Sequence, residues 1–189
     1  MLVNPKFNST TKETIIDRIF DFYQVGVGAN ATDPNHYFYK YTEIFSIIVK
    51  TAIGTEIEAK SDLGWQDQYM YVFNYVRPQD RNLIGNSPGH GYELLYLCGL
   101  NIYTTNGNSN TTEDNLVQSN LAQIFVSFIK GQNPSTNGLS IPKITANSIP
   151  YALVSTDVTI GTTNIKPVVD FWKQLAADYQ FDFLQQIIL

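Results

Sequence analysis

The sequence has little cysteine and little histidine: 189 residues include one Cys and two His. A lone cysteine, Cys98, cannot form a disulfide within the chain, and no spacing of Cys and His suits a zinc site. We therefore predict no metal site and no cofactor. We interpret Cys98 as a small buried apolar residue.

Positive charge is also scarce, since 12 Lys and Arg face 17 Asp and Glu and the formal net charge is −5. No basic cluster is present that would attract a phosphate backbone or an anionic membrane surface. No apolar run reaches the roughly 20 residues that span a bilayer, and the N-terminus lacks the pattern of a signal peptide. We expect no nucleic-acid partner and no membrane segment, and the localisation stays open.

What the chain does contain is enough apolar residues, 43% of the total, for the core of one domain. Helical periodicity and buried-strand patterns alternate along it, which is typical of an α/β protein. The tyrosines of residues 69–75 are interpreted as core residues, and the strand that contains them is expected to be covered on both faces. Two strands are expected, one over 68–76 and an edge strand over 151–161. Five helices are expected, and the residues of the expected buried face are given in brackets: 11–23 (Ile15, Ile19, Phe22, Tyr23), 36–60 (Tyr41, Ile44, Phe45, Ile48, Val49), 92–100, 111–130 (Leu116, Leu121, Ile124, Phe125, Phe128) and 166–189.

A Gly-x-Ser-x-Gly pattern, typical of a serine-hydrolase nucleophile, occurs at Gly85–Gly89. In such sites the backbone N–H after the serine donates to the oxyanion. Here Ser87 is followed by Pro88, which has no N–H. Because losing one oxyanion donor costs about 3–4 kcal/mol of transition-state stabilisation, we interpret Ser87 as a turn residue.

The histidine directly after this pattern is a better candidate. His90 is flanked by Gly89 and Gly91, which allow close backbone approach, in a loop between a buried strand and a helical run. A general base fits this place, although the spacing alone favours a loop histidine without a catalytic role. Of the other candidates, we expect His36 to lie in a surface loop and Trp65 and Trp172 to be packing residues.

The segment "GHGYELLYLCGL" resembles the sequence around the catalytic histidine in the type-B carboxylesterase/cholinesterase family of α/β-hydrolases. Upstream, "YMYVFNYVRP" resembles the aromatic strand of that family, and downstream "IFVSFIKGQNPS" resembles its next helix. "IPY", "ALVSTDVTI" and "FW" then follow in the family's order. The resemblance is clearest over about residues 40–180, within a partial type-B carboxylesterase domain that spans 1–189.

The resemblance implies that His90 is the triad histidine, that Glu93 is a supporting acidic residue but not the triad acid, and that Gly89 and Gly91 support the site. It also implies that the serine and the acid precede His90 by more than the 89 residues available here. The chain is therefore expected to be the C-terminal third of an α/β-hydrolase fold. It would act on a small-molecule carboxylic ester only when completed, and would be inactive alone.

Two alternatives remain open at this stage. One is a non-catalytic relative that binds a protein partner, and the other is a degenerate remnant with uncovered apolar faces. Cholinesterases in this family close a disulfide between the regions of Ile47–Thr51 and Phe171, where this chain has no cysteine, so a general carboxylesterase is favoured. Glycosylation at the sequons of Asn8, Asn30 and Asn110 is undecided.

Overall fold

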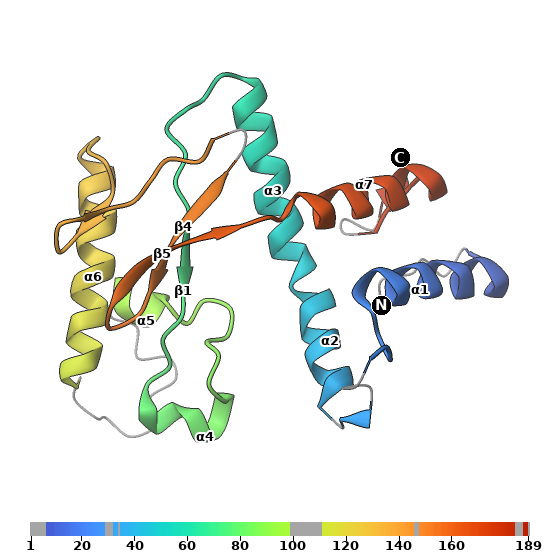
Figure 1. The fold of residues 1–189 in the computed structure, drawn as a ribbon, viewed down its shortest axis with the longest axis horizontal. Coiled ribbons are helices and arrows are strands. Elements are labelled where there is room, and N and C mark those ends of the chain that lie inside the picture. Colours follow the sequence, from blue (N-terminus) through green and yellow to red (C-terminus); the bar gives the residue numbers. More distant parts are fainter. Residues whose placement is uncertain are drawn as a thin grey trace. The chain divides into compact units, whose positions relative to one another are not determined.

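The computed structural model describes residues 7–28, 32–33, 35–98, 111–145, 148–183 and 187–188 (Figure 1). The chain forms two compact units, which are described separately. The first contains Met1–Leu63 together with Ile165–Leu189, and the second contains Gly64–Asn164. Asn30 and Asn110 lie outside the described residues.

The first unit begins with α1, Ser9–Tyr23. The side chain of Asn8 caps this helix, since its Oδ1 accepts a hydrogen bond from the Thr11 N–H at 2.8 Å. The sequence prediction for this helix is confirmed, and so is its apolar face. Ile15, Ile19 and Tyr23 are buried and Phe22 is half-buried.

Helices α2, His36–Phe45, and α3, Ile47–Asp62, divide the single helix expected over 36–60. The expected buried face was wrong, because aromatic residues surround α2 on several sides and cannot all face one core. Tyr41 is 63% exposed and Phe45 is 61% exposed. Val49 is also exposed, Ile44 is half-buried, and the side chain of Ile48 lies outside the described set.

Helix α7, Lys166–Tyr179, starts where the sequence predicted a helix and has Pro167 in its first turn. The helix ends earlier than expected, because Gln180 takes a left-handed conformation. Strand β6, Phe181–Asp182, follows and pairs antiparallel with β7, Ile187–Ile188.

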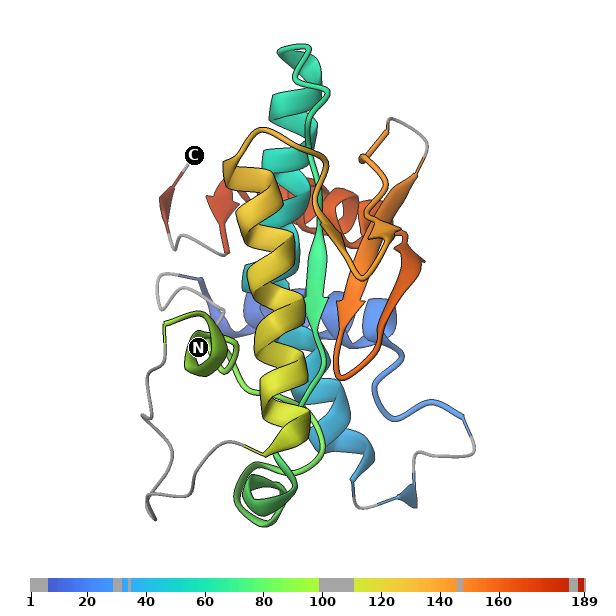
Figure 2. The same cartoon turned by 90° about the vertical axis from the view of Figure 1, so that its left-hand side faces the viewer.

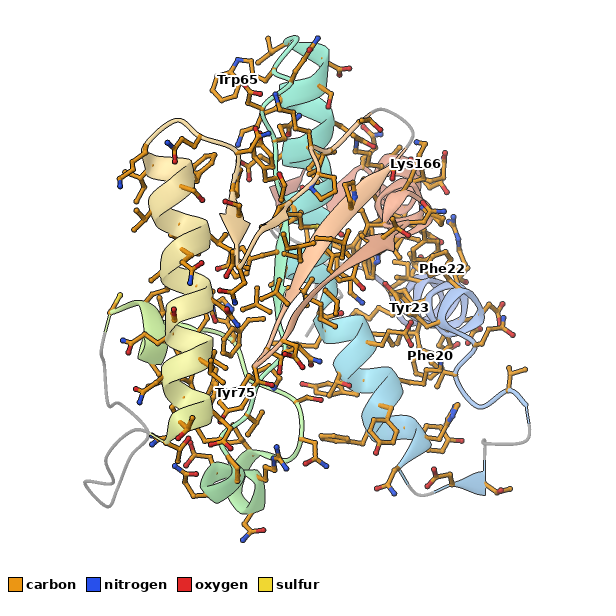
Figure 3. The ribbon with its side chains drawn as sticks, turned by 60° about the vertical axis from the view of Figure 1, so that its left-hand side comes forward. Phe20, Phe22, Tyr23, Trp65, Tyr75 and Lys166 are labelled. Carbon is orange, nitrogen blue, oxygen red and sulfur yellow. The ribbon has the colours of Figure 1, made fainter. Side chains whose placement is uncertain are left out.

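The core of the first unit joins α1 to α7. Trp172 is a packing residue, as predicted, and its Nε1 donates a hydrogen bond to the Tyr23 hydroxyl at 3.0 Å. Figure 3 labels Phe22 and Tyr23 on α1, and the Phe22 ring stacks on Phe171 with 4.0 Å between ring centroids. Gly54 lets α3 approach α7 closely, because a Cβ there would meet the side chain of Val169.

A three-stranded sheet forms the centre of the second unit, in the order β1-β4-β5. Strand β1, Tyr71–Phe73, pairs in parallel with β4, Ile149–Val154, and β4 forms an antiparallel hairpin with β5, Val158–Thr163. The expected edge strand over 151–161 is therefore two strands. The expected strand over 68–76 is shorter; its three residues are only half-buried, and within the described part of the chain it pairs with β4 alone.

Helix α6, Thr112–Ile129, lies along this sheet (Figure 2). Its start is a capping box, in which the Thr111 hydroxyl accepts from the Asp114 N–H and the Asp114 carboxylate accepts from the Thr111 N–H. Burial of Leu121 and Ile124 confirms part of the predicted face, and Phe125 is half-buried. Leu116 and Phe128 are exposed instead, because polar Asp114 and Asn120 occupy the buried side.

Asn120 is buried because the neighbouring backbone satisfies it. Its Nδ2 donates to the carbonyls of Ser155 and Thr156 in the β4–β5 turn, and its Oδ1 accepts from Thr136. Thr136 belongs to a short hairpin of β2, Ser135–Thr136, and β3, Leu139–Ser140. A polar side chain on α6 thus fixes the turn that closes the sheet.

Two single-residue predictions fail in this unit. Trp65 is 62% exposed and points away from the ribbon in Figure 3, so it does not pack in a core. Cys98 is exposed at the end of a short helix rather than buried. No helix in the described ranges is long and apolar enough to cross a membrane.

Candidate active site

The segment from β1 to the predicted histidine is more ordered than its loop composition indicated. It contains a 3₁₀ turn, η2, Pro78–Asp80, and a short helix, α4, Arg81–Ile84. The helical run expected after the histidine is a single turn, α5, Leu94–Leu97. The segment therefore leaves the sheet at the end of β1 and returns beside α6, which α5 contacts.

Ser87 lies in an exposed bend of this segment. Strand β1 ends at Phe73 and helix α4 separates it from the serine, so the strand–turn–helix of a nucleophile elbow is absent around Ser87. This placement agrees with a turn residue.

His90 lies in a tight turn, because the carbonyl of Gly89 accepts a hydrogen bond from the Tyr92 N–H at 3.2 Å. Gly91 is the third residue of this turn and has a φ of +78°, where glycine is favoured over any residue with a Cβ. Gly89 has no such constraint, and a Cβ there would meet nothing within 4 Å. The turn exposes His90 to solvent.

Glu93 follows as the first residue before α5. Its carbonyl accepts hydrogen bonds from the N–H groups of Tyr96 and Leu97, and its side chain is half-buried. Burial, and secondly the Glu93 carboxylate, raise the pKa of the Tyr71 hydroxyl on β1. Within the described residues no hydrogen bond joins Glu93 to the His90 ring.

Beneath the histidine segment is a buried polar group that we call the aspartate cluster. Asp114, at 1% exposure, accepts hydrogen bonds from the hydroxyls of Tyr96 at 3.1 Å and Tyr75 at 3.3 Å. Its other oxygen lies 3.2 Å from Nε of Arg77, which is also buried. Tyr75 lies near the N-terminal end of α6 (Figure 3). The members of the cluster are Tyr75, Arg77, Asp80, Tyr92, Tyr96 and Asp114.

A second carboxylate completes the cluster. The Tyr92 hydroxyl donates to Oδ2 of Asp80 at 2.5 Å, and both residues are buried. With its amide oxygen turned toward Arg77, Gln79 accepts from Nε at 2.9 Å and from Nη2 at 3.0 Å. Arg77 therefore pairs with one carboxylate and donates hydrogen bonds to one amide oxygen.

Burial keeps the tyrosines of this cluster protonated. Burial first, and the Asp114 carboxylate second, raise the pKa of Tyr75 to about 12. The pKa of Tyr92 and of Tyr96 is raised as well, again mainly by burial and then by hydrogen bonding or charge from the nearby aspartates. At neutral pH all three hydroxyls are donors to carboxylates.

Comparison with known proteins now decides the family. The model of the carboxylesterase family matches residues 2–172, which is most of the chain. The chain belongs to the carboxylesterase family. A comparison with the curated proteins finds no match.

Membership in the carboxylesterase family implies the α/β-hydrolase fold, with which the mixed helices and small sheet agree, and it suggests ester substrates. The roles of His90, Glu93, Gly89 and Gly91 stay predictions, as does the extent of the domain. In this carboxylesterase-family chain the structure brings the four residues together in one turn and the start of one helix.

The remaining candidates do not form a second site. His36 is buried at the start of α2, where Nε2 accepts the Gly26 N–H at 3.0 Å, so the expected surface role was wrong. No group of three or more possible metal ligands occurs in the part of the chain that the structure describes. An apolar cavity of about 150 Å³ between β1 and α6, lined by Tyr69, Phe125 and other apolar residues, includes no residue of the histidine turn.

The aspartate cluster was not predicted from the sequence. Asp114 falls within the helix expected over 111–130 but outside its expected buried face. Its remaining partners come from the segment that follows β1 and from α5, and no local pattern predicts that they meet.

Proposed function

We propose that His90 is the general base of a carboxylic-ester hydrolase that uses a serine nucleophile. The observation that carries this proposal is an exposed imidazole in a turn anchored by buried charged residues. A base must reach a hydroxyl that another part of the enzyme presents, and it must be held in place while doing so. The solvent exposure of His90 and the buried hydrogen bond at the end of its turn support this role.

In the proposed reaction the His90 imidazole takes the proton of a serine hydroxyl while that oxygen attacks the ester carbonyl. The same imidazole, now protonated, returns the proton to the leaving alcohol. An acyl-enzyme forms, and water, activated by the histidine in the same way, releases the carboxylic acid. The substrate class is a small-molecule carboxylic ester.

We further propose that the serine and the triad acid lie outside residues 1–189 and that this chain corresponds to the C-terminal third of the complete domain. In α/β-hydrolases the order along the chain is serine, then acid, then histidine. The one pattern that resembles a nucleophile contains Ser87, and Pro88 denies it an oxyanion donor. The isolated chain is therefore inactive in this proposal.

Glu93 is proposed to support the site without being the triad acid. Its side chain is half-buried, and its charge helps to raise the pKa of the Tyr71 hydroxyl on β1. Gly91 permits the turn that carries His90. Gly89 contributes little by this argument, because a side chain would fit there.

Labelling with a fluorophosphonate, which reacts with activated serines, tests the proposal. We expect the full-length product that contains this chain to be labelled at a serine outside residues 1–189. Replacing His90 by Ala should slow labelling and ester turnover by about 10²–10⁴-fold, the usual contribution of a general base. The matched control, Ser87→Ala, should leave both within two-fold (about the scatter expected of an exposed turn residue).

Three results contradict the proposal. Loss of labelling in Ser87→Ala would make this serine the nucleophile. Unchanged turnover in His90→Ala would remove the histidine from the reaction. In addition, a burst of product from an aryl ester with the 189-residue chain alone, abolished by His90→Ala, would show that the chain is complete as a catalyst.

A further inference from the structure

We propose that the buried hydrogen bond between Tyr92 and Asp80 positions His90, so that both are positioning residues for the reaction. This inference rests on the proposed function of His90. It assigns to two residues that touch no substrate the task of fixing where the imidazole lies.

The first step is the turn itself. Tyr92 is the fourth residue of the turn that contains His90, and its N–H closes that turn onto Gly89. The side chain of Tyr92 is 2% exposed while His90 is exposed, so the turn has one buried end and one solvent-facing residue. Only two peptide units separate the buried Tyr92 from the exposed His90.

The second step is the anchor. The Tyr92 hydroxyl donates to Oδ2 of Asp80, twelve residues earlier, at 2.5 Å. Asp80 is the last residue of η2 and is itself buried. This bond closes residues 80–92 into a loop, and His90 is part of that loop. Closing a loop of this length removes conformational freedom from every residue inside it.

The third step is the frame around the loop. Arg77 precedes Asp80 by three residues, Tyr96 follows Tyr92 by four, and both contact the same Asp114 carboxylate. The residues that flank the loop on each side, Arg77 and Tyr96, are thus held together at the start of α6. Within this frame the contact between Tyr92 and Asp80 is the link nearest to His90 in sequence.

The chemistry of the contact suits a fixed anchor. A hydroxyl donating to a buried carboxylate is a charge-assisted hydrogen bond, which is shorter and stronger than a neutral one. Burial and the Asp80 carboxylate raise the pKa of the Tyr92 hydroxyl, so the donor keeps its proton well beyond neutral pH. The anchor therefore stays intact at any pH where an imidazole works as a base.

The test uses the 189-residue chain with isotopically labelled histidine. The chain has two histidines, and His36 is buried, so the signals of His90 can be assigned with His90→Gln. Tyr92→Phe removes only the hydroxyl. The matched control is Tyr69→Phe, which removes a hydroxyl that bonds to Asn133 at 2.8 Å, in the same unit but outside the histidine loop.

We expect the order parameter of the His90 backbone to be near 0.85 in the unchanged chain and in Tyr69→Phe, and to fall below about 0.6 in Tyr92→Phe. Asp80→Asn keeps a carbonyl acceptor and should retain most of the order, whereas Asp80→Leu should behave like Tyr92→Phe. This rescue separates positioning from packing, because both Asp80 variants change the charge but only one keeps the hydrogen bond.

The proposal is overturned if Tyr92→Phe and Tyr69→Phe give the same order at His90, or if Asp80→Asn and Asp80→Leu lose it equally. In the full-length product, Tyr92→Phe should lower kcat at least five-fold and leave KM within two-fold, while Tyr69→Phe should change neither. If instead His90→Ala has no effect on turnover, the proposed function fails while the measured order still decides whether Tyr92 fixes the turn.

Discussion

Replacing Asp114 by Ala gives the most demanding test of the aspartate cluster. The carboxylate has 1% exposure, accepts hydrogen bonds from the hydroxyls of Tyr75 and Tyr96 and from the N–H of Thr111 at 2.9 Å, and forms an ion pair with Arg77. Alanine removes this acceptor and leaves a buried guanidinium beside two buried hydroxyls.

The expected cost follows from the groups left behind. Removing one partner of a buried ion pair destabilises a protein by about 3–5 kcal/mol, because the other charge stays buried without compensation. Each buried hydroxyl that loses its acceptor adds about 1–3 kcal/mol in isolation, but the groups share one cavity and their costs do not add. Arg77 keeps the Gln79 oxygen as an acceptor. We therefore expect about 3–5 kcal/mol in total for Asp114→Ala.

Hydrogen exchange of the α6 amides measures this cost within the second unit. The matched control is Glu113→Ala, which removes an exposed carboxylate from the same helical turn and should cost below about 1 kcal/mol, mainly through the helix dipole. Asp114→Asn keeps an acceptor oxygen and should fall between the two. A cost for Asp114→Ala as small as that of Glu113→Ala would refute the reasoning.

A double-mutant cycle then isolates the ion pair. Asp114→Leu alone leaves Arg77 unpaired, whereas Asp114→Leu with Arg77→Met replaces both charges by apolar groups. The double variant should be more stable than the sum of the single costs predicts by about 1–3 kcal/mol, since neighbouring residues couple to this extent. Additive costs would mean that the two side chains do not depend on each other.

Two further predictions concern the same segment. Gly91→Ala should cost about 1–2 kcal/mol in urea unfolding because its φ is +78°, while Gly89→Ala, where a side chain meets nothing within 4 Å, should stay within about 0.5 kcal/mol; equal costs would contradict the turn geometry. The pKa values of Tyr75, Tyr92 and Tyr96 are raised in the folded chain, so the unfolded chain loses these protons first as the pH rises. The free energy of unfolding should therefore hold below pH 10 and fall above it by about 1.4 kcal/mol per pH unit for each tyrosine. Unfolding at pH 9 and 11 measures this fall, which should be shallower in Tyr92→Phe.

The helices that sequence analysis predicted best are those whose signals are local. Helix α1 shows its buried residues at helical spacing, α6 begins at a capping box, and α7 carries Pro167 in its first turn. Spacing, caps and proline act over a few residues, so one sequence suffices to recognise them. The end of α7 was missed because Gln180, a residue with a Cβ, takes the left-handed conformation that usually marks glycine.

The strands were harder to predict because pairing is not a local property. The alternation in 68–76 indicates a strand, but its hydrogen-bonding partner β4 lies about eighty residues later, and only the register from Tyr71 to Phe73 forms. In the same way, an apolar stretch over 151–161 does not show where a chain reverses. The reversal at Ser155–Asp157 is fixed partly by Asn120 of α6.

His90 and the aspartate cluster also differ in whether their sequence signal is local. The histidine was found through a contiguous motif, whereas Arg77, Tyr96 and Asp114 are separate in sequence and meet only after the chain has folded. A charged residue in a sequence is expected on the surface, and nothing local distinguishes Asp114 from its exposed neighbour Glu113. Such buried carboxylates are recognisable only from the partners that surround them.

That contrast bears on why the cluster is polar at all. Apolar side chains of similar volume often stabilise a protein as well as a buried ion pair does, so stability alone gives little reason to bury Arg77 with Asp114. Hydrogen bonds, however, fix direction as well as distance, and the hydroxyls of Tyr92 and Tyr96 each point at one carboxylate. An apolar core would hold the segment near α6 without defining the orientation of the turn. A general base must be positioned to within tenths of an ångström. The proposed role of His90 therefore requires hydrogen bonds that fix the orientation of its turn.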